Sequence, residues 1–317
     1  MKRFLTILIK LILTALIMIF LIRKLRMDQI LDAFQNPSQP VWLVLAAVLV
    51  IPNLIVQWYR WHYLLRLIQP DIPVSESISS FFGGVTVGSI TPGRLGEFGR
   101  ALFLKKVNRM QALGLMLVDK IYATAPVIIG GVWGIGILFF YQTNYRLFIV
   151  LPLIFIGLII TLVIVLIVRR PGVIRSFLYQ ITVLLPFRDK MKLVLESLDK
   201  FGKEQARPFI FLSSIFYVIY ILQFCFLGFA FQSMELTSAL SATMSTMFAK
   251  AMLPISFGDL GIREGASIYF FMQFGISKIT AFNAALLLFI LNVFIPSIIG
   301  LVFLPKLTFV NKKSQSK

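Results

Sequence analysis

Two short segments of the chain place charged residues beside glycines in otherwise apolar sequence. They read G-R-L-G over residues 93–96 and G-D-L-G over residues 258–261. Arginine binds phosphate and carboxylate groups through parallel hydrogen bonds, and nearby carboxylates balance its charge. These residue types predict a binding site for a charged group rather than a site of covalent chemistry. The predicted substrate-binding residues are Arg94, Glu97, Arg100, Asp119, Asp259, Arg263 and Glu264.

Glycine and proline interrupt both segments, and we expect these residues to act as structural hinges. Both residue types release backbone polar groups, which the bilayer interior tolerates only where protein buries them or where they line a wet cavity. Paired interruptions in two halves of a membrane protein are the best sequence indication of a transport site. The predicted hinge residues are Pro92, Gly93, Gly96, Pro254, Gly258 and Gly261.

The composition argues against other kinds of site. The chain has one cysteine, Cys225, and one histidine, His62. These residues are too few for a disulfide framework, a nitrogen-rich metal cluster or a nucleophilic triad. The ATP-binding pattern G-x-x-x-x-G-K-[ST] does not occur in the sequence either. We therefore expect a protein that is not an enzyme and that needs no metal and no cofactor.

The composition also predicts an integral membrane protein, because 58% of the residues are hydrophobic and only 14% are charged. A membrane-spanning helix needs about 20 apolar residues, and six stretches meet that length. The first stretch lacks a small-residue cleavage site and is followed by a basic cluster, which indicates an uncleaved span rather than a signal peptide. The six stretches are Phe4–Ile22, Val41–Tyr59, Leu113–Tyr141, Leu147–Val168, Phe209–Phe231 and Ile279–Leu304.

Two further apolar pieces, Ser77–Thr91 and Ser238–Phe257, lead into the two glycine motifs. We interpret each as one limb of a re-entrant hairpin that enters the membrane and returns to the same side. The halves 41–141 and 209–304 then share the order span, hairpin, span with opposite orientation. The predicted fold is an all-α polytopic membrane protein, with about six full spans and two re-entrant helical hairpins in an inverted repeat. It forms one membrane domain over residues 1–310.

The net charge of +18 fits membrane topology better than nucleic-acid binding, because the basic residues lie mainly in loops between spans. Most of them fall on the face that holds both termini, the 60–110 region with Arg60, the loop 169–207 and the tail 305–317. By the positive-inside rule both termini are cytoplasmic, in a multi-pass protein of the plasma membrane. We expect the loop to be an amphipathic segment on anionic lipid.

Each residue of the first motif has two interpretations. Glu97 and Arg100 are spaced to form a simple surface pair on a helix, or to join Arg94 at the helix start in a phosphate cradle. Asp119 lies in an apolar span and needs a cation, for which Arg94 and Arg100 are candidates. Its neighbour Lys120 projects about 100° away on an α-helix.

The residues of the second motif also have two interpretations. Asp259 is a candidate N-cap for a helix that begins near Leu260, with Arg263 as its partner, and a candidate site residue. Lys250 either extends to the membrane surface or belongs to the site. Aligning the motifs sets Arg94 opposite Asp259, which suggests an ion pair between the hairpin tips that opens when a phosphate competes for the arginine.

The segments P-G-R-L-G-E (Pro92–Glu97) and S-F-G-D-L-G-I-R-E (Ser256–Glu264) resemble the two signatures of the lysylphosphatidylglycerol synthase/flippase transmembrane family. The resemblance extends over nearly the whole chain. The second signature usually reads P-G-G-L-G, and here Phe257 replaces its proline and Asp259 its middle glycine. The best-known members continue into an aminoacyl-transferase domain. Only Pro305–Lys317 follow the last predicted span here, so we expect a stand-alone flippase-like protein.

The resemblance and the arginine-rich motifs together predict a lipid flippase-like transporter. Its substrate would be an anionic or zwitterionic phospholipid or a polyprenyl-phosphate lipid, which binds at a midplane site between the two hairpins. The alternative is a non-transporting accessory subunit of a separate lipid-modifying glycosyltransferase or transferase. A small-solute secondary transporter fits the inverted repeat but not the family. The expected partners are membrane lipids, with no nucleic acid.

Overall fold

The computed structural model describes residues 35–91, 93–142, 146–183, 188–253 and 259–306, and every regular element in these ranges is a helix. In chain order they are α3 (Pro40–Val48), α4 (Val50–Ile68), α5 (Val74–Ser89), the 3-10 helix η1 (Leu95–Phe103), α6 (Arg109–Gln142), α7 (Arg146–Arg169), α8 (Pro171–Val183), α9 (Arg188–Asp199), α10 (Lys203–Phe231), α11 (Leu236–Met252), α12 (Ile262–Met272), α13 (Lys278–Phe289), the π-helical turn η2 (Ile290–Phe294), α14 (Ile295–Leu301) and the 3-10 turn η3 (Leu304–Lys306).

Among the described residues, five helical stretches are long and apolar enough to cross a bilayer. Each coincides with a predicted span, which confirms the prediction of an all-α polytopic membrane protein. The sixth predicted span, Phe4–Ile22, lies outside the described residues. The five stretches are Pro40–Ile68, Arg109–Gln142, Leu151–Arg169, Lys203–Phe231 and Lys278–Leu301.

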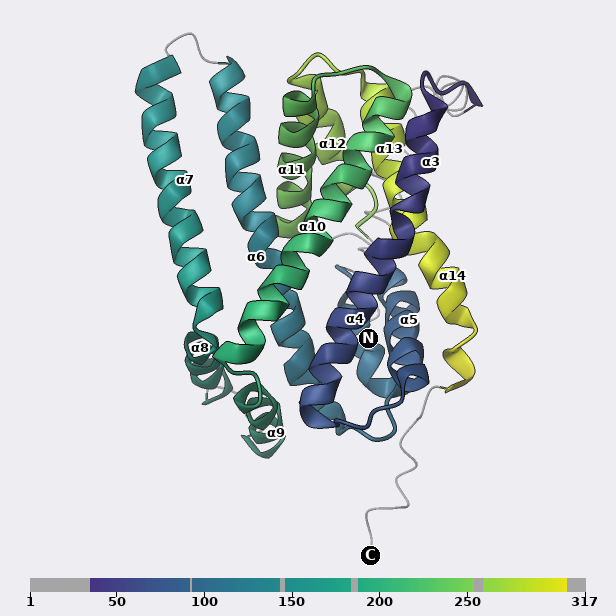
Figure 1. Ribbon diagram of the computed structural model, residues 1–317, viewed down its shortest axis with the longest axis vertical. Helices are drawn as coiled ribbons and strands as arrows, with labels where there is room; N and C mark the ends of the chain where they lie inside the picture. The colour runs from purple at the N-terminus through teal and green to yellow at the C-terminus, as the bar shows by residue number, and fades with distance from the viewer. Residues whose placement is uncertain (1–34, 92, 143–145, 184–187, 254–258, 307–317) are drawn as a thin grey trace, which may run out of the picture.

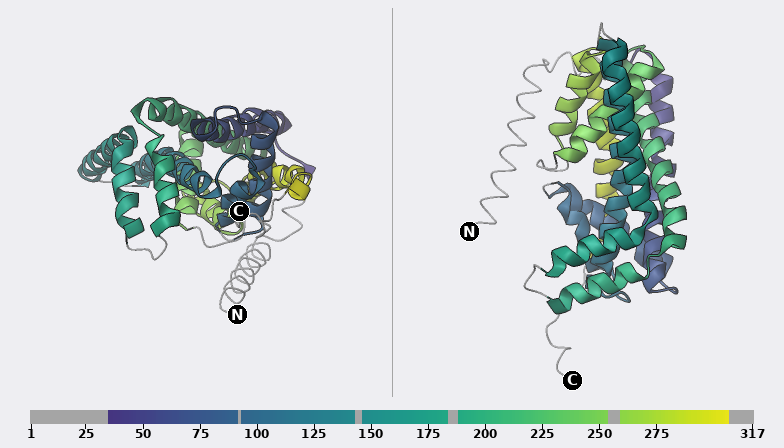
Figure 2. Two further views of the ribbon diagram at one scale, coloured as in Figure 1. Left: turned by 90° about the horizontal axis from the view of Figure 1, so that it is seen from below. Right: turned by 90° about the vertical axis from the view of Figure 1, so that its left-hand side faces the viewer.

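Two helical hairpins lie between the long helices, at the positions that the glycine motifs predict. The first consists of α5 and η1, which pack against each other along their lengths, and the second of α11 and α12. They occupy opposite halves of the bundle, with α5 in the lower half and α11 and α12 in the upper half (Figure 1). Their tips point toward each other near mid-height (Figure 2). The inverted-repeat prediction requires this arrangement.

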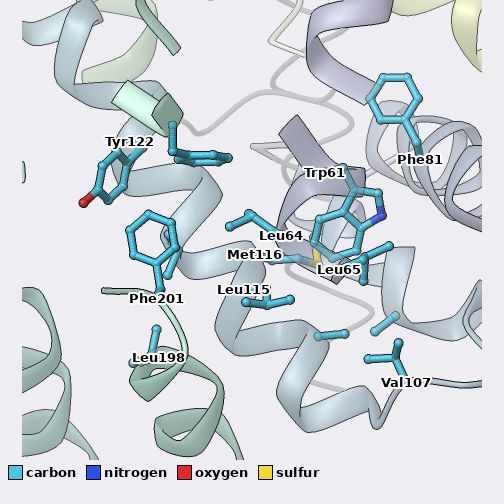
Figure 3. Packing of buried hydrophobic residues seen from close by; sticks show 14 of the residues in the cluster. Trp61, Leu64, Leu65, Phe81, Val107, Leu115, Met116, Tyr122, Leu198 and Phe201 are labelled. Carbon is cyan, nitrogen blue, oxygen red and sulfur yellow. The ribbon is translucent and has the colours of Figure 1, made fainter. Parts of the chain in front are cut away.

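The apolar core consists of two clusters, one around each hairpin. The lower cluster surrounds Trp61 and Phe81 and includes residues of α6 and α9 (Figure 3). The upper cluster surrounds Phe224 and Phe271, with residues of α10, α11 and α13. Each cluster holds one hairpin against the long helices, so that the level between the two clusters is left for polar residues.

Small residues let α6 and the second hairpin approach closely. A Cβ at Gly131 would overlap the side chain of Phe248, and one at Gly134 would press on Met244 and Ser245. The Ser241 hydroxyl donates to the Gly134 carbonyl at 2.6 Å. Such contacts between small residues drive helix association inside a bilayer, where lipid tails offer no hydrophobic advantage to packing.

The basic loop 169–207 forms two short helices at the lower end of the bundle, α8 and α9 (Figure 1). A buried face of α9 packs on α6, where Gly114 leaves room for Val194 and Ser197. A half-exposed ion pair joins Arg175 to Asp199 at 2.6 Å. The loop is therefore docked on the helix bundle and not only spread over a surface.

The close approach at Gly131 predicts a selective loss of stability. We expect Gly131→Leu to lower the thermal unfolding midpoint. The crowded neighbour is the Cβ of Phe248, which cannot swing away, and overpacking of this kind costs roughly 1–3 kcal/mol. Gly136→Leu on the same helix is the matched control, since a Cβ there meets no atom within 4 Å. Equal midpoints for the two variants in detergent would contradict the proposed close packing of α6 and α11.

Candidate functional site

The two hairpin tips share an unusual backbone conformation at equivalent positions. Arg94 and Asp259 have φ values of 55° and 65°, and they are the only non-glycine residues with positive φ in the described part of the chain. Each occupies the second position of its G-x-L-G motif. Gly93 and Gly261 also have positive φ, at 56° and 85°. Left-handed conformation is costly for a residue with a side chain, so both tips must be held by their surroundings.

Of the remaining predicted hinge residues, Gly96 lies within the described residues and three others do not. A Cβ at Gly96 would collide with the Val87 carbonyl and the Thr91 side chain, so the residue must be small for the tip to close. Three predicted hinge residues lie outside the described residues, namely Pro92, Pro254 and Gly258.

The helix that follows the first tip is a 3-10 helix. With three residues per turn, side chains three apart are eclipsed, which puts Glu97 and Arg100 in one row, and an ion pair with Glu97 brings Arg94 beside them. The row lies over α5, where Gly84 faces the Arg100 side chain and Gly88 faces Glu97. The glycines of α5 therefore make room for charged side chains, which the sequence pattern did not indicate.

These side chains line a cavity of about 240 Å³ between the two tips. Five cationic and three acidic residues surround it, which leaves a surplus of two positive charges. The charged lining residues are Arg60, Arg94, Arg100, Lys120, Lys250, Glu97, Asp119 and Asp259. The neutral polar lining residues are Gln57, Thr124, Tyr217, Tyr220 and Asn292.

Two carboxylates organise the cations of the first hairpin. Glu97 pairs with Arg94 at 2.6 Å, with Lys120, and more distantly with Arg100 at 3.9 Å. Asp119 pairs with Arg60 at 2.6 Å and with Arg100 at 3.5 Å. Arg100 is thus one of the cations expected for Asp119, whereas Arg94 is not its partner. The neighbours Asp119 and Lys120 both reach the cavity despite their angular separation on α6, because lysine is long.

The second hairpin corrects three expectations. Asp259 pairs with Lys250 at 2.9 Å and not with Arg263. It does not cap the following helix, because α12 begins at Ile262 and its N-cap residue is Gly261. The direct pair between Arg94 and Asp259 is not among the ion pairs of the described residues. Each of these two residues has a partner in its own hairpin, although both line the same cavity.

Arg263 and Glu264 lie behind the cavity and are not part of its lining. Both side chains are fully buried and pair with each other at 2.7 Å. The second carboxylate oxygen of Glu264 accepts a hydrogen bond from the Gly261 backbone N–H at 2.6 Å. Through this hydrogen bond the pair stabilises the strained turn at the second tip. Arg263 and Glu264 therefore support the site and do not line it.

Arg60 is the main cavity residue that the sequence analysis missed. It was assigned to the cytoplasmic face, but it lies within α4 and is only 3% exposed. Its guanidinium carbon stands 5.1 Å from the Phe209 ring centre and 5.6 Å from that of Phe216, a cation–π arrangement. A signal was available in the apolar pattern of this span, which continues to Ile68 and so places Arg60 inside the helix.

Asn292 was missed because its position depends on a backbone irregularity. It lies in the π-helical turn η2, four residues before Pro296, and donates to the Gln223 side chain at 2.8 Å. A π-turn inside a helix often occurs at a functional site and re-aims the side chains beside it. The only local feature of the sequence that indicated an irregular helix near Asn292 was Pro296.

The ion pair of the second tip predicts a strong energetic coupling. Removing one partner of a buried pair costs about 3–5 kcal/mol, since the other charge is left uncompensated, and removing both costs less. We therefore expect Lys250→Met and Asp259→Asn to lower the unfolding midpoint separately, and the double variant to recover part of the loss. The control is a second double-mutant cycle that combines Asp259→Asn with Arg94→Met. Its coupling energy should be smaller than that between Lys250 and Asp259. Additive effects for Lys250 and Asp259 would rule out this pair.

Comparison with known proteins agrees with the family resemblance that the two motifs indicated. Residues 7–300 match the family described as the lysylphosphatidylglycerol synthase TM region. The chain is also similar to the UPF0104 membrane protein MJ1595 of Methanocaldococcus jannaschii, with 22% identity over 93% of each chain. No solved structure matches the chain. The resemblance inferred from the motifs is thereby confirmed, and the chain belongs to the lysylphosphatidylglycerol synthase transmembrane-region family.

Proposed function

We propose that this protein moves a lipid with a phosphate-containing headgroup between the two leaflets of the plasma membrane and is not itself an enzyme. The headgroup crosses in the cavity between the hairpin tips while the hydrocarbon tails stay in the bilayer. Both termini face the cytoplasm. The substrate is an anionic phospholipid or a polyprenyl-phosphate lipid in preference to a zwitterionic one, because the cavity has a surplus of two positive charges.

The observation that carries this proposal is a set of buried hydrogen-bond donors that have no acceptor among the described residues. The Nε–H groups of Arg60, Arg94 and Arg100 are buried and have no hydrogen-bond acceptor among the described residues. A buried donor without a partner costs roughly 1–3 kcal/mol. The three arginines line one cavity, so an anion with several oxygens that draws their guanidinium groups toward it would supply acceptors, and arginine with phosphate is the strongest such combination.

The position of the cavity supports transfer rather than static binding. Transporters built from inverted repeats bind their substrates near the midplane, where broken helices of both halves meet. Here one tip reaches the cavity from each half of the bundle. A headgroup at this level has left one surface and has not yet reached the other. The family description and the two motifs support a role with lipids.

The test is leaflet exchange of a headgroup-labelled phosphatidylglycerol in vesicles that contain the purified protein. We expect exchange to be faster than in protein-free vesicles, and faster than exchange of labelled phosphatidylcholine. Arg60→Ala should slow it about tenfold or more, because a hydrogen bond to a charged group contributes roughly 1.5–3 kcal/mol and each 1.4 kcal/mol is a factor of ten.

Arg66→Ala is the matched control, since Arg66 lies on the same helix, is exposed and does not line the cavity. Its exchange rate should equal that of the unmodified protein. Lys250→Met should also slow exchange, which extends the test to the second hairpin. Equal rates with and without protein for several anionic lipids would refute transfer. That result would favour the accessory role beside a separate transferase, which co-purification would then reveal.

A further inference from the structure

An apolar groove of about 390 Å³ runs between α6 and α7, next to the charged cavity. Except at its end it is lined by aliphatic side chains, which are Ile121, Ala125, Ile128, Ile164, Ile167 and Val168. Two hydrogen bonds join α6 to α7 near its ends. The Tyr122 hydroxyl donates to the Val168 carbonyl at 2.6 Å, and the Trp133 indole donates to the Thr161 hydroxyl at 3.2 Å.

Lys120 and Thr124 line both the groove and the charged cavity, so the two spaces adjoin at these side chains. The Lys120 side chain is 43% exposed, whereas its partner Glu97 is 5% exposed. Lys120 therefore stands at the opening, with its amine toward the carboxylate inside and its stem along the groove. An amphipathic side chain suits a boundary of this kind, since its methylenes accept apolar contact and its charge does not.

We propose that this groove holds one hydrocarbon chain of the lipid whose phosphate occupies the cavity, and that Lys120 is the side chain between the two parts. The inference rests on the proposed function and names the substrate class more closely as a lipid with phosphate directly next to its tails. The groove is within the size range of ligand sites. Burial of each methylene there contributes about 0.8 kcal/mol.

The lining residues shared with the cavity select this groove over a second one. Another apolar groove of about 260 Å³ lies further along the same two helices, around Ile137 and Ile154. It shares no lining residue with the charged cavity. A tail in the second groove would therefore have no direct connection to a phosphate in the cavity. The two grooves give a test and a control made from the same two helices.

The experiment uses phosphatidylglycerol with a diazirine in one acyl chain, in phosphatidylcholine vesicles that contain the full chain. After illumination, we expect cross-links at Ile121, Ile164 and Ile167. Diacylglycerol with the same diazirine should label these residues about tenfold less, because it lacks the phosphate that the cavity binds. Equal labelling by both probes would show ordinary contact with surrounding lipid and would overturn the inference.

Filling the groove is the second arm. Ile128→Trp should reduce both the cross-links and the leaflet exchange by about tenfold or more, since excluding two methylenes from an apolar site already has that effect. Ile137→Trp, in the second groove, should change neither. An unchanged thermal midpoint shows that each variant is folded. Ile164→Trp, from α7, repeats the test if Ile128→Trp does not fold.

The two proposals fail in different ways. If exchange proceeds but the groove is not labelled, or Ile128→Trp exchanges normally, the groove assignment is wrong and transfer stands. If no exchange occurs but phosphate-dependent labelling of the groove persists, the lipid site stands and transfer is wrong. If neither exchange nor labelling occurs, both are wrong.

Discussion

The structure depends on pairing charged side chains of opposite sign inside a bundle that is otherwise apolar. A single uncompensated charge at membrane depth costs at least several kcal/mol, so cations and carboxylates must meet within a few ångströms. Glu97 and Asp119 perform this role for the first hairpin, because together they contact Arg60, Arg94, Arg100 and Lys120. These contacts join α4, η1 and α6 at the level of the cavity.

The backbone follows from the same requirement. A 3-10 turn eclipses side chains three residues apart, so η1 brings Glu97 and Arg100 to the cavity together, and the ion pair with Glu97 holds Arg94 beside them. The row can lie against α5 because Gly84 and Gly88 have no side chains there. The positive φ at Arg94 is the cost of turning the chain sharply enough to begin this helix at the tip.

The sequence predicted whole elements better than it predicted partners. Long apolar runs define spans by themselves, and the glycine motifs marked both hairpin tips. The pairing of Asp259 with Lys250 depends on how α11 returns beside the tip, which no local pattern contains. The same holds for Arg60, which looked like a loop residue until α4 was seen to continue past it.

The two hairpins differ in how their charges are held. The first is tied to the long helices, since displacing it would separate Glu97 from Lys120 on α6 and Arg100 from Asp119. The charges of the second hairpin have partners inside it, Lys250 with Asp259 and Arg263 with Glu264. A movement of the second hairpin as a unit therefore breaks no ion pair among the described residues. Among the described residues, ion pairs fix the first hairpin to the spans, whereas packing, hydrogen bonds and the cation–π contact of Arg263 with Phe289 hold the second.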